Sequence, residues 1–114
     1  MTNNGLVTIK NVRGYIGENG VAFLNLEDVA RGLGYERVEN RNNKEYKSIR
    51  WATIEKYLKE FGFANKLAKD DFIPENVFYK LCMKANNEVA RKFQDLVCDE
   101  ILPSIRKNGG YIVN

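Results

Sequence analysis

An Asn-Gly dipeptide at positions 19–20 most strongly constrains how the N-terminal part of this chain can fold. Asn-Gly is the two-residue sequence most typical of tight β-hairpins, because both residues accept positive φ angles. Short apolar segments stand on both sides of it: Leu6–Ile9 and Arg13–Gly17 before the dipeptide, and Val21–Leu24 after it. The sequence therefore predicts a small antiparallel sheet near the start of the chain.

A short helix is predicted directly after this sheet. Asn25 is a favourable N-cap residue, and acidic residues follow it in the first turn, where they complement the helix dipole. Apolar residues recur at helical spacing as far as Leu33, and Gly34 is typical of the position just after a helix. We expect the apolar side of this helix to pack against the sheet.

Residues 35–50 differ from the rest of the chain because they are polar, rich in asparagine and only weakly periodic. Two interpretations remain open for them. Asn42-Asn43 could turn a hairpin between Val38 and Tyr46, or the whole segment could be a mobile loop. Ile49–Trp51 is expected to form a short strand at its end.

Two helices are expected in the middle of the chain. Thr53 is placed to cap the first of them, which ends at Gly62. Phe72 and Ile73 then lead to Pro74, which suits the first turn of a helix because its missing N–H would be unpaired there in any case. The second helix is therefore expected to begin at this proline.

The last helix is expected to begin at Asn87 and to run towards Ile105, with Pro103 kinking or ending it near Leu102. Its broad apolar stripe indicates core packing, or in part a homodimer face or a docking surface for a partner protein. A chain of 114 residues is long enough for one core. The sequence thus predicts a single α+β domain over residues 1–114, with a small N-terminal antiparallel β-sheet packed against about four helices.

The complete absence of histidine limits the chemistry available to the chain. It excludes Ser-His-Asp and Cys-His arrangements and every metal site that uses imidazole. Cys82 and Cys98 are too far apart for a Cys-x-x-Cys motif. The acidic pairs Asp70-Asp71 and Asp99-Glu100 are sequence neighbours, whose side chains diverge on a helix. We expect no enzymatic activity, no metal site and no cofactor.

The chain shows no sign of membrane association or secretion. No apolar segment approaches the roughly 20 residues that a membrane-spanning helix needs. The first residues lack the basic and apolar regions of a signal peptide, and the low cysteine content fits a reducing compartment. We therefore expect a cytoplasmic protein.

The positive charge of the chain is concentrated in two short segments. The formal net charge is +3, from 18 basic and 15 acidic residues. Residues 37–50 and 103–114 each carry an excess of basic residues, and the first segment places its cations among asparagines and Tyr46. Cations neutralise phosphates, and arginine and asparagine read base edges, so residues 37–50 indicate either a DNA-binding ribbon or loop, or a solvated loop. The candidate contacts are Arg37, Arg41, Lys44, Lys47 and Arg50, and we expect these side chains to face outward together.

Several motifs carry a resemblance to a known family. Glu100–Tyr111 reads E-I-L-P-S-I-R-K-N-G-G-Y, and residues 28–35 read D-V-A-R-G-L-G-Y. Together with Asp71–Glu75, Phe78-Tyr79 and Met83–Glu88, these motifs closely resemble prophage antirepressor proteins with a Bro-N-type N-terminal domain. The resemblance implies a bacteriophage or prophage regulator in the cytoplasm of a bacterial host cell, and we expect the C-terminal domain usual in that family to be absent.

The resemblance leaves two mechanisms open. The N-terminal module of the family is regarded as DNA-binding, which adds Arg106 and Lys107 of the matched motif to the candidate contacts, unless that motif simply ends the domain. Antirepressors as a class also act by binding a phage repressor and lifting lysogenic repression. We expect a transcription regulator that binds DNA, with a protein-directed antirepressor or inhibitor as the alternative.

Overall fold

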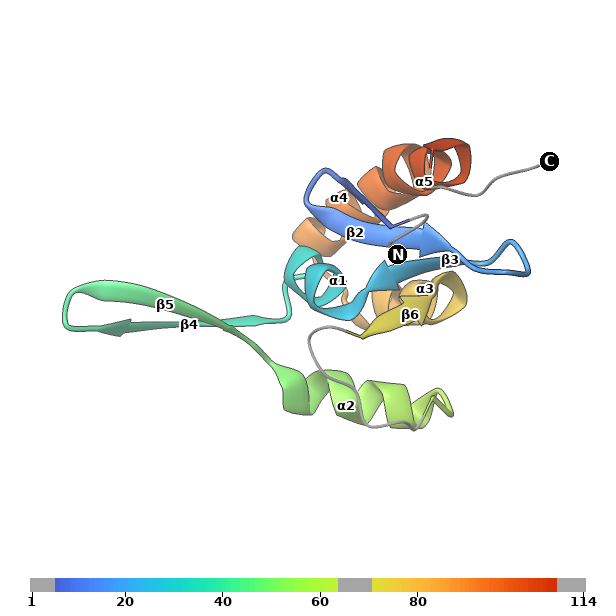
Figure 1. The fold of residues 1–114 in the computed structure, drawn as a ribbon. Helices are drawn as coiled ribbons and strands as arrows, with labels where there is room; N and C mark the ends of the chain where they lie inside the picture. The colour runs from blue at the N-terminus through green and yellow to red at the C-terminus, as the bar shows by residue number, and fades with distance from the viewer. Residues whose placement is uncertain (1–5, 64–70, 109–114) are drawn as a thin grey trace.

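The computed structural model describes residues 6–63 and 71–108, which form an α+β domain with a four-stranded antiparallel sheet (Figure 1). The strands lie in the order β1-β2-β3-β6, so β6, the last strand along the chain, pairs with β3. A second sheet consists only of β4 and β5. The bounds of the four-stranded sheet are β1 (Val7–Ile9), β2 (Val12–Ile16), β3 (Ala22–Asn25) and β6 (Phe72–Pro74).

The hairpin predicted at Asn19-Gly20 is confirmed, because β2 and β3 pair antiparallel across it. The loop is longer than two residues, and within it only Gly20 takes a positive φ, of 78°. The Gly20 amide donates to the carbonyl oxygen of Gly17 at 3.0 Å, and the Gly17 amide donates to that of Val21 at 2.8 Å. This is the pattern of a turn followed by a left-handed glycine, which also closes a β-hairpin.

Four helical segments complete the described part of the chain, in agreement with the predicted fold class. Asn25 and Asn87 cap the first and last segments as predicted, by accepting hydrogen bonds from the amides of Asp28 at 3.0 Å and Ala90 at 2.8 Å. The segments are α1 (Leu26–Gly32), α2 (Trp51–Glu60), α3 (Glu75–Lys84) and a continuous one formed by α4 (Glu88–Leu96), a π-helical turn η1 (Val97–Ile101) and α5 (Leu102–Asn108).

Two predicted boundaries at the start of α2 are wrong, and a strand before α3 was missed. Helix α2 begins at Trp51 rather than after Thr53, because the carbonyl oxygen of Arg50 already accepts the amides of Thr53 and Ile54. The predicted strand at Ile49–Trp51 is limited to its first residue, which ends β5. The prediction also missed β6, which ends at Pro74. A proline is tolerated here because β6 is an edge strand, in which not every backbone N–H has to pair with a neighbouring strand.

Pro103 does not end the last helix, which continues to Asn108. The turn directly before the proline is π-helical, with the Leu102 amide donating to the carbonyl oxygen of Val97, five residues back. Proline lacks an N–H and its ring crowds the preceding turn of an α-helix. A wider turn at this point lets the helix pass through the proline, so that α5 still packs on the sheet.

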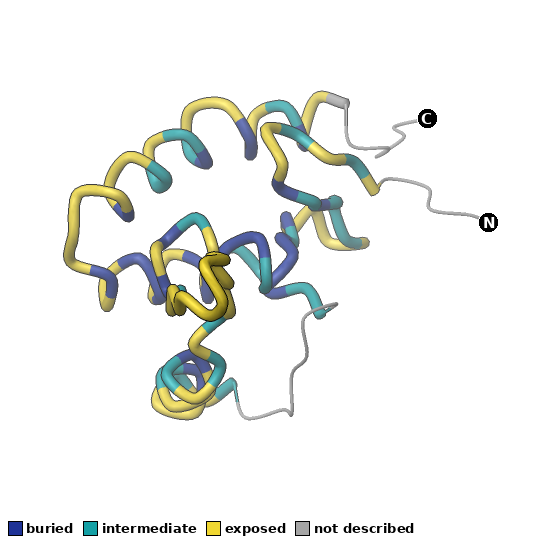
Figure 2. The backbone as a smooth tube through the Cα atoms, turned by 90° about the vertical axis from the view of Figure 1, so that its left-hand side faces the viewer, coloured by how far each residue is buried: buried dark blue, intermediate teal, exposed yellow. Residues whose placement is uncertain are grey.

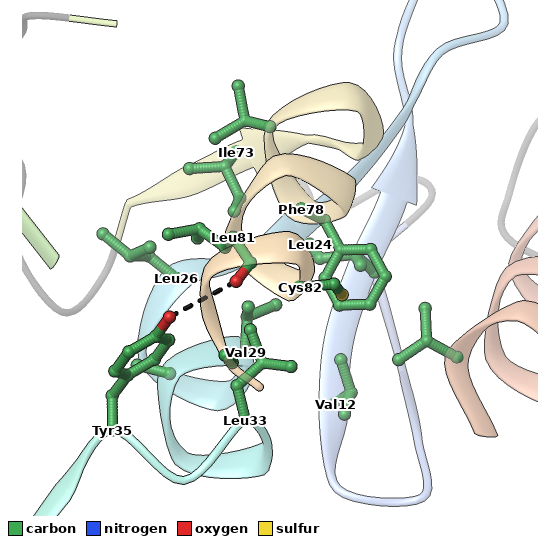
Figure 3. Packing of buried hydrophobic residues seen from close by; sticks show 14 of the residues in the cluster. Val12, Leu24, Leu26, Val29, Leu33, Tyr35, Ile73, Phe78, Leu81 and Cys82 are labelled. Atoms are coloured by element: carbon green, nitrogen blue, oxygen red, sulfur yellow. Dashed lines mark hydrogen bonds between the residues drawn. The ribbon is translucent and has the colours of Figure 1, made fainter. Parts of the chain in front are cut away.

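The core lies on one face of the sheet, beneath α1, α3 and α5 (Figure 3). Leu24, Phe78 and Ile105 are fully buried there, whereas the outward sides of the helices are exposed (Figure 2). Gly14 lets α5 approach β2 closely: a Cβ added at this position would lie 2.6 Å from Cδ1 of Ile105 and 2.8 Å from the backbone oxygen of Phe23. The remaining pair of strands contributes little to this core.

Candidate nucleic-acid interface

Strands β4 (Glu36–Arg41) and β5 (Lys44–Ile49) form a two-stranded ribbon that projects from the body of the domain (Figure 1). Asn42 and Asn43 connect them with φ angles of 53° and 64°, the conformation of a type I′ turn. The segment is therefore a hairpin rather than an irregular loop.

The ribbon has no hydrophobic core of its own. Every residue from Arg37 to Ser48 is exposed, including Val38 at 50% and Tyr46 at 42% of their reference areas. A two-stranded hairpin that packs on nothing is only marginally stable in water. Its side chains are thus displayed to the surroundings rather than used to fold the domain.

The root of the ribbon is fixed to the body by Tyr35 and Arg50. Tyr35 is buried, and its hydroxyl donates to the carbonyl oxygen of Leu81 at 3.3 Å (Figure 3). The Arg50 amide donates to the carbonyl oxygen of Tyr35 at 2.9 Å, and Arg50 Nε donates to that of Glu36 at 3.1 Å. Arg50 therefore uses part of its guanidinium to hold the root.

Alkaline conditions should loosen this root. Burial, followed by Tyr57 and Cys82, raises the pKa of Tyr35 from 10.0 to about 12. Because the folded state favours the neutral phenol, the stabilisation is complete below pH 10 and is lost as the pH rises through 12. We expect wild-type protein to unfold at a higher temperature than Tyr35→Phe at pH 8, and the gap to shrink towards pH 12, measured by circular dichroism. A gap independent of pH would contradict this assignment.

The register divides the ribbon side chains between two faces, because directly opposed residues of an antiparallel pair point to the same side. We call one the arginine face; it carries Arg37 opposite Ser48, Glu39 opposite Tyr46, and Arg41 opposite Lys44. The other, the valine face, carries Glu36 opposite Ile49, Val38 opposite Lys47, and Asn40 opposite Glu45. The predicted cations are thus all exposed but do not share one side.

Most cations of the ribbon form no ion pair with an acidic residue of the described chain. Within the described residues, Arg37, Lys44 and Lys47 form no ion pair. Arg41 Nη2 lies 3.9 Å from Glu39 Oε1, a long and exposed contact that contributes little to stability. The ribbon therefore presents cationic groups that remain available to an external anion.

Arg106 and Lys107 lie away from the ribbon, near the end of α5 (Figure 1). Arg106 forms an ion pair with Glu75, at the start of α3. The same carboxylate accepts a hydrogen bond from the Ala22 amide at 3.2 Å, so that Arg106 helps to tie α5 to α3 and β3. The fold does not bring these two residues together with the other five candidates.

Comparison with known proteins identifies the family. The sequence profile of the BRO family, N-terminal domain, matches residues 11–103. The chain belongs to the Bro-N family. This confirms the resemblance seen in the sequence, and the family is associated with phage regulatory and antirepressor-like proteins.

Two relatives of this Bro-N chain come from invertebrate iridescent viruses. Putative Bro-N domain-containing protein 201R of invertebrate iridescent virus 6 is 31% identical over 102 residues, covering 76% of this chain and 24% of the relative. Putative Bro-N domain-containing protein 019R of invertebrate iridescent virus 3 is 52% identical over 40 residues, covering 35% of this chain and 10% of the relative. The chain thus spans about a quarter or less of these relatives. No solved structure gives a significant match.

The Bro-N structure also reveals a contact that the sequence did not indicate. Arg31 of α1 pairs with Glu27 at 2.7 Å and reaches Glu36 at the start of β4 at 3.5 Å. The four-residue spacing of Glu27 and Arg31 was visible in the sequence, but the link to the ribbon depends on the tertiary fold.

Among residues 6–63 and 71–108, no helix has the length and apolar character needed to cross a bilayer.

Proposed function

We propose that this Bro-N chain is a non-enzymatic regulatory protein that binds duplex DNA through the β4–β5 ribbon. The exposed, largely unpaired cations of that ribbon carry the proposal. A two-stranded β-ribbon is narrow enough to enter the major groove, and cations on it can neutralise the phosphates on both sides. Arg106 and Lys107 are not needed for such a contact, because α5 lies elsewhere in the domain.

The regulatory context is proposed from the family. Bro-N domains are associated with phage regulatory proteins, so the DNA would be viral or prophage DNA in the cytoplasm of an infected bacterial cell, and the outcome a change in transcription or lysogeny. The names of the two iridescent virus proteins give only the domain. The proposal for this chain therefore depends on its own ribbon.

A salt titration tests the proposal. We expect the logarithm of the association constant for a duplex of arbitrary sequence to fall linearly with the logarithm of the salt concentration, with a slope of about −3 to −4 if three or four ribbon cations meet phosphates. Fluorescence anisotropy of a labelled duplex measures this slope. No binding at a salt concentration of about 50 mM, where phosphate contacts are strong, would reject the proposal.

Protein-directed antirepression is the second candidate function. It is favoured by apolar side chains exposed on α3 and α4, with Met83 at 80% and Val89 at 60% of their reference areas. Large exposed apolar side chains on a monomer can mark a protein-binding surface. If this candidate is correct, the chain should co-elute with a phage repressor, and Met83→Ser with Val89→Ser should abolish co-elution without altering the salt titration on DNA.

A further inference from the structure

The two faces of the ribbon differ in charge. The arginine face carries Arg37, Arg41 and Lys44 against the single carboxylate of Glu39. On the valine face, Lys47 is balanced by Glu45, and the Glu36 carboxylate at the root pairs with Arg31. A polyanion is therefore attracted more strongly to the first face, all of whose residues are exposed, than to the second.

Arg41 is held in a defined position on the arginine face. Its Cζ atom lies 4.7 Å from the centre of the Tyr46 ring, and its Nη2 atom lies 3.9 Å from Glu39 Oε1. Stacking on an aromatic ring uses the flat face of a guanidinium and leaves its N–H groups free at the edge. The Arg41 side chain is still 66% exposed, so these donors are accessible.

Lys44 lies directly opposite Arg41 at the tip of the ribbon. Like charges in opposed positions of a hairpin destabilise it. The two cations at the tip therefore repel each other and do not stabilise the hairpin. A phosphate group placed beside them would remove this repulsion. This arrangement is typical of an element whose positive charges are neutralised only when it binds an anion.

We infer that the arginine face is the side of the ribbon that enters the major groove, and that Arg41 reads a guanine there by donating two N–H groups to O6 and N7. The inference depends on the DNA-binding function proposed above. Arg37 and Lys44 flank this reader and contact phosphates. A guanidinium matches the two adjacent acceptors of guanine, and a side chain fixed on a tyrosine ring loses little conformational entropy on binding.

Selection from a pool of duplexes with a randomised core of about 12 base pairs, roughly one turn of the major groove, tests the inference. Wild-type protein should enrich a guanine at one position or more. Arg41→Lys keeps the charge but lacks the planar, fork-shaped pair of donors of a guanidinium, so it should lose that preference by roughly 10- to 100-fold. Its affinity for an unselected duplex should stay within about threefold, because the number of phosphate charges is unchanged.

Two further variants separate the faces and the stack. Lys47→Gln on the valine face should keep the guanine preference and serves as the matched control. Tyr46→Leu removes the ring beneath Arg41 while keeping an apolar side chain, and it should weaken the preference without abolishing DNA binding. Circular dichroism shows whether each variant remains folded, which we expect because all three side chains are exposed.

The outcomes distinguish this inference from the proposed function. If wild-type protein binds duplexes without enriching any base, or if Arg41→Lys keeps the guanine preference, the inference is overturned and DNA binding remains. A preference lost in Lys47→Gln but kept in Arg41→Lys would assign reading to the valine face and also overturn it. If wild-type protein retains no duplex at low salt, the proposed function itself fails.

Discussion

Replacing Arg37, Arg41 and Lys44 together with glutamine is expected to weaken binding to duplex DNA by about two to three orders of magnitude near 0.1 M salt. These three residues form the cationic part of the arginine face: Arg37 and Lys44 are each expected to release about one counterion from a phosphate, and Arg41 is expected to contact a base. The slope of log K against log salt should become shallower by about two, one for each phosphate contact removed. Anisotropy titrations of wild-type and variant protein on the same duplex measure both quantities.

A second triple variant, with the same change in net charge, controls for the effect of the domain's overall charge on DNA affinity. Lys59, Lys80 and Arg91 are exposed on α2, α3 and α4, and none forms an ion pair within the described residues. Their replacement with glutamine should cost less than about tenfold, because scattered charges act only through a screened long-range field. If both triple variants lost the same affinity, the ribbon would not be the contact surface.

The sequence predicts those parts of the fold that depend on neighbouring residues. Asn25 and Asn87 cap helices through their own side chains, which reach amides only three residues ahead. Asn42-Asn43 forms a hairpin because asparagine tolerates the left-handed conformation that a type I′ turn requires. Each of these features is decided within a few residues, so the local pattern is sufficient.

The missed strand shows where local patterns fail. Phe72–Pro74 has only three residues, too few to display a period, and ends in a residue that usually argues against a strand. It is a strand because β3, far earlier in the chain, offers a free edge for pairing. The extended conformation here is set by the tertiary fold rather than by propensity.

The sequence predicts that the cations between Arg37 and Arg50 face outward together; they are exposed, but the prediction of a single shared surface is wrong. The sequence identifies the cations between Arg37 and Arg50, yet their distribution between two faces follows only from the register. The use of Arg50 at the ribbon root and of Arg106 against Glu75 depends on backbone and side-chain groups brought together by folding. A charge count along the chain cannot separate a displayed cation from one that holds the fold.

Replacing Phe78 with alanine is expected to lower the free energy of unfolding by about 3–5 kcal/mol. Phe78 is fully buried between α3 and the sheet (Figure 3). Its ring meets that of Phe93 edge-on, with 6.2 Å between centroids. The substitution removes buried apolar area and leaves a cavity that the surrounding side chains fill only in part. Such a loss is a large share of the roughly 5–15 kcal/mol that stabilises a typical domain. Urea unfolding followed by circular dichroism measures it.

Tyr46→Ala is the matched aromatic truncation outside the core. Tyr46 is exposed on the ribbon, so its loss should change the free energy of unfolding by less than about 1 kcal/mol. A similar destabilisation by Phe78→Ala and Tyr46→Ala would mean that the ribbon is part of the cooperative core. The expected contrast instead separates a domain held together by Leu24, Phe78 and Ile105 from a ribbon whose side chains are left to contact a partner, because folding does not require them.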